Sequence, residues 1–209
     1  MRRLTVSSIE PGADVIGDAA EVIRRGGLVG FPTDTLYGIA ADPFNREAVR
    51  RVCALKGRMA GQPLPLVAAD TAQVEAAVGP LSDVGRALAA EFWPGPLTLL
   101  LEAPHGLAAE VAAGTGRVGV RVPAHPVPRA LCARAALLLT ATSANRTGEP
   151  PSDDADGVVQ SIGSGLDVLI DAGPTPGGLP STIVDVSRMR LVRAGAVPWE
   201  KIEACLRRC

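Results

Sequence analysis

Apolar residues along the chain follow two patterns, short continuous runs and longer stretches in which they recur every three or four positions. The short runs, bounded by Gly, Pro or polar residues, predict strands. We place these strands at residues 4–9, 28–31, 64–69, 97–101, 118–122, 137–141, 168–170, 183–186 and 191–193. The helical spacing predicts helices from about residue 14 to the glycines at 26–27, and at 46–55, 71–78, 82–92, 127–136, 155–162 and 199–206.

The order of these elements predicts the fold class. Strands alternate with helices over the whole chain, which favours an α/β protein with a twisted, mixed or mostly parallel sheet flanked by helices. No repeat, low-complexity tract or linker divides the sequence, so we expect residues 1–209 to form one domain.

Polar side chains gather where several predicted strands begin or end. Thr33–Thr35 follows one apolar run, Thr142–Asn145 follows a later one, and Ser181 precedes a third. Lys56 and Arg58 come directly after a predicted helix. Strand ends are where α/β sheets bind ligands, and hydroxyls with fixed cations suit an anionic ligand that must be oriented. Ser143 and Asn145 are also good turn formers, so a purely local role stays open for them.

Two cations have a structural alternative. Lys56 falls at the C-terminal end of a helix, where the dipole favours a positive charge, so it fits a structural role as well as a ligand role. Arg121 lies inside a short strand between two valines. In a central strand it would need a partner or an anionic ligand, whereas on an edge strand it could face water.

Composition and motifs exclude several kinds of site. The net charge of −1 gives no attraction of the whole protein to nucleic acid, so any polyanion site must be local. Aromatic residues make up 3%, which argues against a base-stacking platform. The GxGxxG at residues 114–119 leads into a strand instead of opening a helix, so it is not a dinucleotide fingerprint. The sequence also has no GxxxxGK[ST] phosphate loop.

The cysteines and the apolar runs bear on metals and on location. Cys53, Cys132, Cys205 and Cys209 form no CxxC pair, so we expect no metal site built from protein side chains. No secretory signal is visible, and the apolar run at residues 135–141 is too short to span a bilayer. We therefore expect a reducing, cytoplasmic location and no membrane partner.

Taken together, the polar clusters resemble the YrdC-like threonylcarbamoyl-adenylate synthases, which begin the threonylcarbamoyladenosine modification of tRNA. Their order and spacing match over roughly residues 10 to 195, and the pairing of Lys-x-Arg with Ser-x-Asn is the signature of that family. The matching stretches are PTDTLYG (32–38), KGR (56–58), WPGPLT (93–98), VGVRVPAH (118–125), TSANRTGEPPS (142–152), STIVD (181–185) and RAG (193–195).

The resemblance implies a YrdC-like fold with a large concave cavity, and it implies a reaction. L-threonine, bicarbonate and ATP would give threonylcarbamoyl-AMP and pyrophosphate, with Mg²⁺ entering on the ATP phosphates. It further implies a downstream tRNA threonylcarbamoyl-transferase complex that collects the product, with tRNA itself as a further partner.

The resemblance also implies roles for individual residues. Threonine would be held by Thr35, Arg121 and Ser181, with Thr33 holding the turn together. ATP would be met by Lys56, Arg58, Gln62, Arg117, Ser143, Asn145, Ser152 and Arg193. The catalytic group would be Lys56, Arg58, Ser143 and Asn145.

Two departures place the sequence in the short, single-domain branch. The chain ends soon after the catalytic domain, and Val67 stands where some long-branch members have a histidine. Two other functions stay open. One is an RNA-binding, ribosome- or tRNA-associated paralogue without synthase activity. The other is a carbamoyl-adenylate-forming enzyme that uses carbamoyl phosphate, although the zinc-finger-like and acylphosphatase-like segments of such enzymes are not found here.

Overall fold

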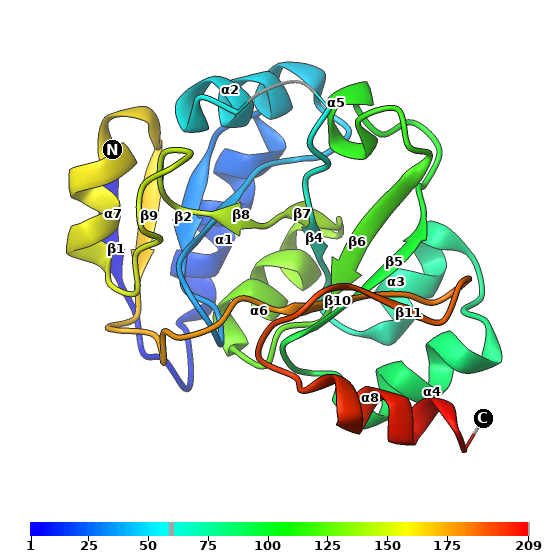
Figure 1. Cartoon of the computed structure of the whole chain (residues 1–209). Coiled ribbons are helices and arrows are strands. Elements are labelled where there is room, and N and C mark those ends of the chain that lie inside the picture. Colours follow the sequence, from blue (N-terminus) through cyan, green and yellow to red (C-terminus); the bar gives the residue numbers. More distant parts are fainter. Residues whose placement is uncertain (59–60, 209) are drawn as a thin grey trace.

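The computed structural model describes residues 1–58 and 61–208, and its strands form two mixed sheets (Figure 1). The five-stranded sheet has the order β1-β9-β2-β3-β8 and the six-stranded sheet the order β11-β10-β5-β6-β4-β7. The first contains β1 (Arg2–Thr5), β2 (Val29–Phe31), β3 (Gly38–Ala40), β8 (Thr142–Ser143) and β9 (Val168–Asp171). The second contains β4 (Leu66–Val67), β5 (Leu97–Glu102), β6 (Arg117–Arg121), β7 (Leu139–Thr140), β10 (Thr182–Asp185) and β11 (Arg190–Arg193).

The helices flank these sheets, as the alternating pattern predicted. They are α1 (Ala13–Arg24), α2 (Arg46–Lys56), α3 (Thr71–Val78), α4 (Asp83–Phe92), α5 (Ala109–Ala112), α6 (Pro126–Ala135), α7 (Ala155–Ile162) and α8 (Trp199–Leu206), with a 3₁₀ turn at Gly163–Gly165. Helix α1 packs on α6, and α8 lies beside α4 (Figure 1). Among the described helices, none combines the length and the apolar character that crossing a membrane requires.

The α/β class with a mixed sheet is confirmed, but the sequence led us to expect one sheet where there are two. Within the run predicted as a strand at 137–141, Leu139–Thr140 forms β7 in the six-stranded sheet, and the next residues form β8 in the five-stranded sheet. Ala141 lies between them and donates its N–H to the Pro65 carbonyl, 2.9 Å away. This segment therefore carries the chain from one sheet to the other.

Four short elements have no counterpart in the prediction: β3, α5, β8 and the 3₁₀ turn at Gly163–Gly165. Strand β3 returns antiparallel to β2 directly after the Thr33–Thr35 turn. Gly38 permits this close return, because a Cβ there would lie 3.2 Å from the Phe31 ring. Elements of two to four residues carry too little periodicity to be found in a sequence.

The strands of the six-stranded sheet alternate between a buried face and a cavity face. The buried face of β5, β6 and β10 contributes Leu97, Leu99, Val118, Val120 and Val184 to the hydrophobic core. The residues between them face the cavity: Thr98, Leu100, Gly119, Arg121, Ile183 and Asp185. Side chains alternate along a strand, so every second residue is available for a site.

Candidate active site

The polar strand ends of both sheets meet around one cavity of about 790 Å³. The five-stranded sheet contributes the turn at residues 33–38 and the strand β8, and the six-stranded sheet contributes β5, β6, β10 and β11. Seven of the predicted site residues line it: Thr35, Arg58, Arg117, Arg121, Ser143, Ser181 and Arg193. The large concave cavity that the family resemblance implied is therefore present.

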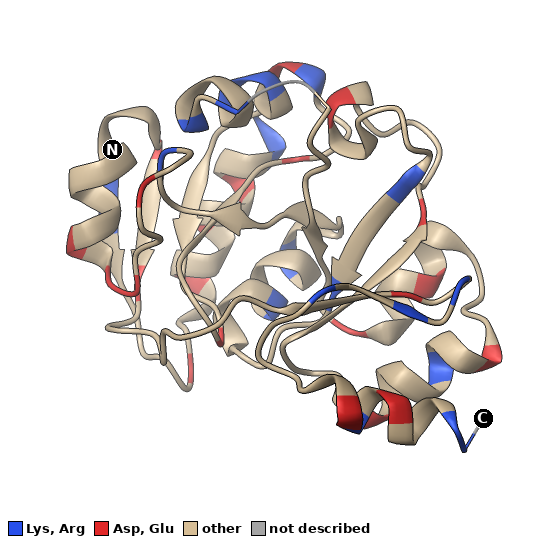
Figure 2. Ribbon diagram, viewed as in Figure 1, with Lys and Arg blue, Asp and Glu red and all other residues tan. Residues whose placement is uncertain are grey.

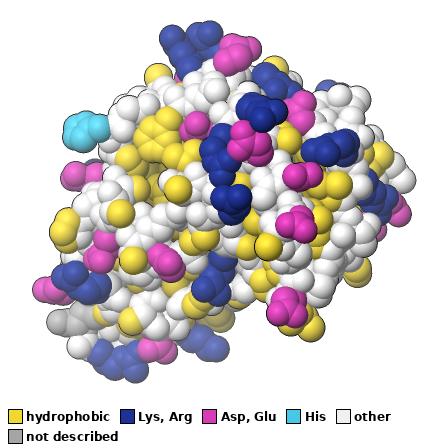
Figure 3. Space-filling model, turned by 180° about the vertical axis from the view of Figure 1, so that it is seen from behind, with side chains coloured by type: hydrophobic (Ala, Val, Ile, Leu, Met, Phe, Trp, Pro, Cys, Tyr) yellow, Lys and Arg dark blue, Asp and Glu magenta, His cyan; other side chains and the backbone are white. Residues whose placement is uncertain are grey.

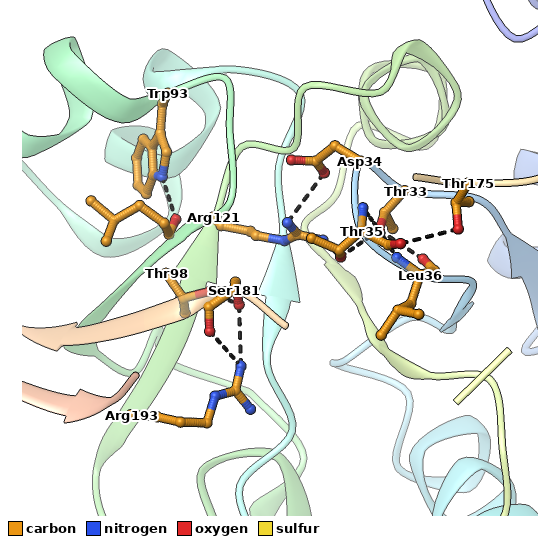
Figure 4. Close-up of polar contacts among 11 residues, drawn as sticks. Thr33, Asp34, Thr35, Leu36, Trp93, Thr98, Arg121, Thr175, Ser181 and Arg193 are labelled. Atoms are coloured by element: carbon orange, nitrogen blue, oxygen red, sulfur yellow. Dashed lines mark hydrogen bonds and ion pairs between the residues drawn. The ribbon is translucent and has the colours of Figure 1, made fainter. Parts of the chain in front are cut away.

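A hydroxyl-centred turn shapes the first side of the cavity (Figure 4). Thr33 Oγ1 donates to the Leu36 carbonyl at 2.7 Å and accepts the N–H groups of Thr35 and Leu36 at 3.1 and 3.2 Å. Thr33 thus holds the turn together, as predicted. The Thr35 hydroxyl lies 3.0 Å from that of Thr33 and points toward the six-stranded sheet.

Arg121 reaches this turn from β6. The strand lies between β5 and β4, so the edge-strand alternative for Arg121 is wrong. Its guanidinium donates to Asp34 Oδ1 at 3.2 Å and to Thr35 Oγ1 at 3.4 Å, and the residue is 8% exposed. Burial lowers the pKa of Arg121, and the Asp34 carboxylate acts against that shift. The partner that a central-strand arginine needs is therefore Asp34, which sequence reasoning did not single out.

Asp34 has spare hydrogen-bonding capacity. Its Oδ2 atom is buried and has no hydrogen-bond partner within residues 1–58 and 61–208. The sequence offered no signal that pairs Asp34 with Arg121, because the two residues lie 87 positions apart.

Ser181 and Arg193 form a second polar group on the six-stranded sheet. The Ser181 and Thr98 hydroxyl oxygens are 2.8 Å apart, and Arg193 Nη2 donates to the Ser181 carbonyl at 2.7 Å and to its hydroxyl at 3.3 Å. The pKa of Arg193 is lowered by burial and by the nearby charge of Arg121. Arg121 and Arg193 line the same cavity, and two guanidinium groups in one cavity favour an anionic ligand there.

Lys56 lies behind the cavity wall. Asn45 caps the start of α2 as predicted, and Gly57, with φ of 60°, ends the helix directly after Lys56. The ammonium donates to the carbonyls of Ser143 and Asn145 at 2.5 and 2.8 Å, and Asn145 Oδ1 is 3.4 Å away. Lys56 is 3% exposed, and burial together with the Arg58 charge lowers its pKa to about 8.

The Lys56 ammonium therefore organises the turn that carries Ser143 and Asn145. Asn145 is buried too, and its amide donates to the carbonyls of Arg146 and Glu149 at 2.9 and 2.7 Å. Of this turn, Ser143 is the predicted site residue that lines the cavity.

Arg58 lines the cavity beside this turn. Its Nη2 donates to the Pro63 carbonyl at 2.7 Å and its Nε to the Gln62 carbonyl at 3.3 Å, and burial lowers its pKa. The Gln62 side chain is exposed. Ser152 is half-buried and accepts the Tyr37 N–H through its carbonyl at 3.0 Å. The structure therefore holds both of these residues through their backbone carbonyls.

Arg117 also lines the cavity, where it pairs with a buried acid. Its two amino groups donate to the Asp185 carboxylate at 2.7 and 2.9 Å, and one also donates to the Leu100 carbonyl. Asp185 is 1% exposed, and this pairing with Arg117 holds the pKa of its carboxyl well below the usual range. Arg188 and Arg190 lie 4.0 Å from the same carboxylate and also line the cavity, and Figure 2 shows cationic positions along β11.

Charge elsewhere is more evenly mixed. On the face seen from behind, cationic and anionic side chains are interspersed with scattered hydrophobic ones (Figure 3). Within the described residues, no three His, Cys, Asp or Glu side chains come close enough to hold a metal ion.

Cys132 is buried, which raises the pKa of its thiol, and Cys209 lies outside the described residues.

Comparison with known proteins identifies the family. The family model Sua5_yciO_yrdC, described as "Telomere recombination", matches residues 21–195. A threonylcarbamoyl-AMP synthase of Bacillus subtilis is 36% identical over 91% of this chain, and one of Thiobacillus denitrificans is 37% identical over 82%. The crystal structure of Pyrococcus abyssi Sua5 complexed with L-threonine superposes with a TM-score of 0.93 at 34% identity, over 99% of this chain.

These relatives differ in length. The chain spans 56% of the Bacillus protein and 61% of the Pyrococcus structure, but 91% of the Thiobacillus protein. Assignment to the short branch stays a prediction. The family model covers most of the chain, and the Thiobacillus relative matches it over nearly its full length. The chain therefore belongs to the Sua5/YciO/YrdC family.

Proposed function

We propose that the protein is an L-threonylcarbamoyladenylate synthase, which converts L-threonine, bicarbonate and ATP to threonylcarbamoyl-AMP and pyrophosphate. The observation that carries this proposal is one cavity with two cationic sides, Arg121 and Arg193 on one and Arg58 beside Ser143 on the other. Its volume lies within the range of small-molecule sites. Relatives named threonylcarbamoyl-AMP synthase, and a threonine complex of a relative, support the same reaction.

Threonine would occupy the Arg121 side. The guanidinium spends two N–H groups on Asp34 and Thr35 among the described residues, and a guanidinium has five. The remaining donors suit a forked contact with the amino-acid carboxylate. The Thr35 and Ser181 hydroxyls lie within the same part of the cavity and would orient the rest of the molecule.

ATP would occupy the opposite side. Arg58 and Ser143 line it directly, and Arg193 would reach the phosphates from beside Ser181, while Lys56 and Asn145 hold the backbone that presents Ser143. Arg117, Gln62 and Ser152 are weaker candidates for nucleotide contacts. Arg117 is paired with Asp185, and the structure engages the other two residues through their carbonyls.

Mg²⁺ belongs to the proposal as the ion that accompanies the ATP phosphates. The polar side chains of the cavity are mainly cationic or hydroxyl-bearing, a set that suits phosphate oxygens and leaves the ion to ligands supplied by the nucleotide. When bound, the ion would neutralise phosphate charge as pyrophosphate leaves.

The chemistry needs positioning more than a protein nucleophile. The threonine amine combines with bicarbonate to give a carbamate, and water is released. A carbamate oxygen then attacks the α-phosphorus, and pyrophosphate leaves. Arg121 and Arg58 would hold the two reactants in line, and a cavity between two sheets would keep water from the carbamate. Because the product is a reactive mixed anhydride, we extend the proposal to a downstream tRNA threonylcarbamoyl-transferase complex, with tRNA as a further partner.

Incubation with ATP, Mg²⁺ and labelled bicarbonate, with each amino acid in turn, tests this function. Nucleotide chromatography should show a labelled adenylate only with threonine, together with an equal amount of pyrophosphate. Equal ATP turnover with serine, glycine or no amino acid would remove the threonine assignment. Salt-sensitive tRNA binding without any ATP turnover would favour the RNA-binding paralogue instead.

A further inference from the structure

The strand β5 places one hydroxyl in the cavity that the reaction above does not use. Thr98 is 2% exposed, and its Oγ1 lies 2.8 Å from Ser181 Oγ on the neighbouring strand segment (Figure 4). Ser181 Oγ is in turn 3.3 Å from Arg193 Nη2. The Ser181 hydroxyl therefore lies between a hydroxyl and a cation, and these two neighbours determine where its proton points.

The direction of that proton follows from the donors present. A guanidinium only donates, so Arg193 occupies one lone pair of Ser181 Oγ. Within the described residues, Ser181 Oγ is the single hydrogen-bond partner of the buried Thr98 hydroxyl, which must give its proton to an acceptor. Thr98 therefore donates to the second lone pair, and the Ser181 proton turns into the cavity.

The neighbouring strand β6 leaves room for the Thr98 side chain in this orientation. A Cβ at Gly119 would lie 2.9 Å from the Thr98 methyl group, closer than such contacts occur. Leu100 pairs with Gly119 across the two strands, so Thr98 and Gly119 are diagonal neighbours on the cavity face. Glycine at this position lets the Thr98 side chain keep the rotamer that reaches Ser181.

We propose that Thr98 is a positioning residue for substrate binding, since it orients the Ser181 hydroxyl as a hydrogen-bond donor toward an oxygen of the amino-acid substrate. The inference rests on the proposed function and deepens it. Thr98 itself does not touch the substrate. Removing its hydroxyl frees a lone pair of Ser181, and the proton is then no longer directed at the ligand.

The test compares Thr98→Val with Thr98→Ser in the full chain. Valine keeps the shape and β-branching of threonine but has no hydroxyl. By calorimetry, Thr98→Val should weaken threonine binding about threefold to tenfold, the worth of one neutral hydrogen bond, and change ATP binding less than about twofold. Kinetically, the threonine KM should rise by the same factor at nearly constant kcat. Thr98→Ser should restore both values.

A double-mutant cycle separates positioning from packing. In a Ser181→Ala background, Thr98→Val should have no further effect on threonine binding, since the hydroxyl that it orients is gone. Gly119→Ala, which displaces the Thr98 methyl group, should lower threonine affinity in the same direction and serves if Thr98→Val folds poorly. Thr5→Val, at an exposed position of β1, is the matched control.

Three results would overturn the inference. They are an unchanged threonine affinity in Thr98→Val, an equal loss for threonine and ATP, and an undiminished effect in the Ser181→Ala background. Each of them leaves the synthase reaction of the wild type intact. A wild-type protein that binds no threonine would instead remove the proposed function, and the inference with it.

Discussion

Two buried cations at the cavity, Lys56 behind its wall and Arg121 in its lining, differ in how many of their N–H groups the protein itself binds. Four protein oxygens surround the Lys56 ammonium. The Ser143 and Asn145 carbonyls are the nearest, and Asn145 Oδ1 and Ser143 Oγ lie farther away, so the three N–H groups are satisfied by the protein. Arg121 donates two of its five N–H groups to described side chains, Asp34 and Thr35, and the residue lines the cavity. A buried cation whose donors are all bound by the protein, such as Lys56, stabilises the site. A cation with spare donors, such as Arg121, remains available to a ligand.

This difference predicts different losses on substitution. Removing Lys56 should damage the fold and the site together, because carbonyl oxygens lose their donor. Removing a donor that faces the cavity should damage ligand binding or turnover alone. Arg58 and Arg121 are both donors that face the cavity. Substituting Arg58 tests this prediction on the nucleotide side, and substituting Arg121 tests it on the threonine side.

The largest effect is expected for Arg58→Ala. Loss of one preorganised cationic donor on the nucleotide side should lower turnover by roughly two to three orders of magnitude. The melting temperature should stay close to that of the wild type, since Arg58 is half-buried and bonds only two carbonyls at the cavity edge. Arg46→Ala, on the exposed face of α2, is the matched control. An unchanged rate in well-folded Arg58→Ala would leave Arg58 with a structural role only, as the donor to the Gln62 and Pro63 carbonyls.

Lys56→Met should lower both turnover and stability. Two buried carbonyls would lose their charged donor, at a cost of roughly 2–3 kcal/mol in the free energy of unfolding. Chemical denaturation measures this loss, and Lys201→Met, at an exposed position of α8, is the control. A fully stable Lys56→Met protein with low turnover would move Lys56 into the class of ligand-binding cations.

The sequence predicted well those features that depend on local pattern. The cap at Asn45 and the extent of three helices, α3, α7 and α8, needed only neighbouring residues. The two valines around Arg121 indicated that its side chain takes the opposite face, and in the structure that face is the cavity. Period-two alternation is a property of the strand itself, so it needs no knowledge of the rest of the fold.

Features that depend on distant partners were not predictable in this way. Arg121 finds Asp34, 87 positions earlier, and Arg117 finds Asp185, 68 positions later. A strand pattern tells which face a side chain takes but not which residue faces it from another element. The same limit explains Lys56, because its place at a helix end fitted a structural role as well as a ligand role until the Ser143–Asn145 turn was seen beside it.

Arg121→Lys should have a smaller effect than Arg58→Ala, because it keeps the charge of a cation that faces the ligand. Lysine keeps the charge but loses one of two parallel hydrogen bonds to a carboxylate, so threonine binding should weaken by about 1–3 kcal/mol. ATP binding should be nearly unaffected, because the nucleotide side has its own donors in Arg58 and Ser143. Calorimetric titration of both ligands measures the two effects. Equal losses for threonine and ATP, with a lower melting temperature, would instead make Arg121 a structural partner of Asp34.

The smallest expected effect is the loss of turnover at alkaline pH, which tests whether the Lys56 ammonium holds the Ser143–Asn145 turn. Burial lowers the pKa of Lys56 from 10.5 to about 8, so the ammonium loses its proton as the pH rises through 8. A neutral amine has two N–H groups for four facing oxygens, one fewer than the ammonium, and the turn at Ser143 loosens by one hydrogen bond. Turnover should therefore decline severalfold between about pH 7.5 and 9.5.

Because the chain contains two lysines, Lys56 and Lys201, carbon-13 labelling of lysine gives two side-chain signals that report this titration directly. Lys201→Arg removes one signal and so assigns the other to Lys56. The Lys56 signal should move with a midpoint near pH 8, and turnover should fall over the same range. If that signal stays at its charged position up to pH 10 while turnover still falls, the alkaline loss belongs to another group. The hydrogen bonds to the four oxygens around Lys56 would then be strong enough to hold the proton against burial.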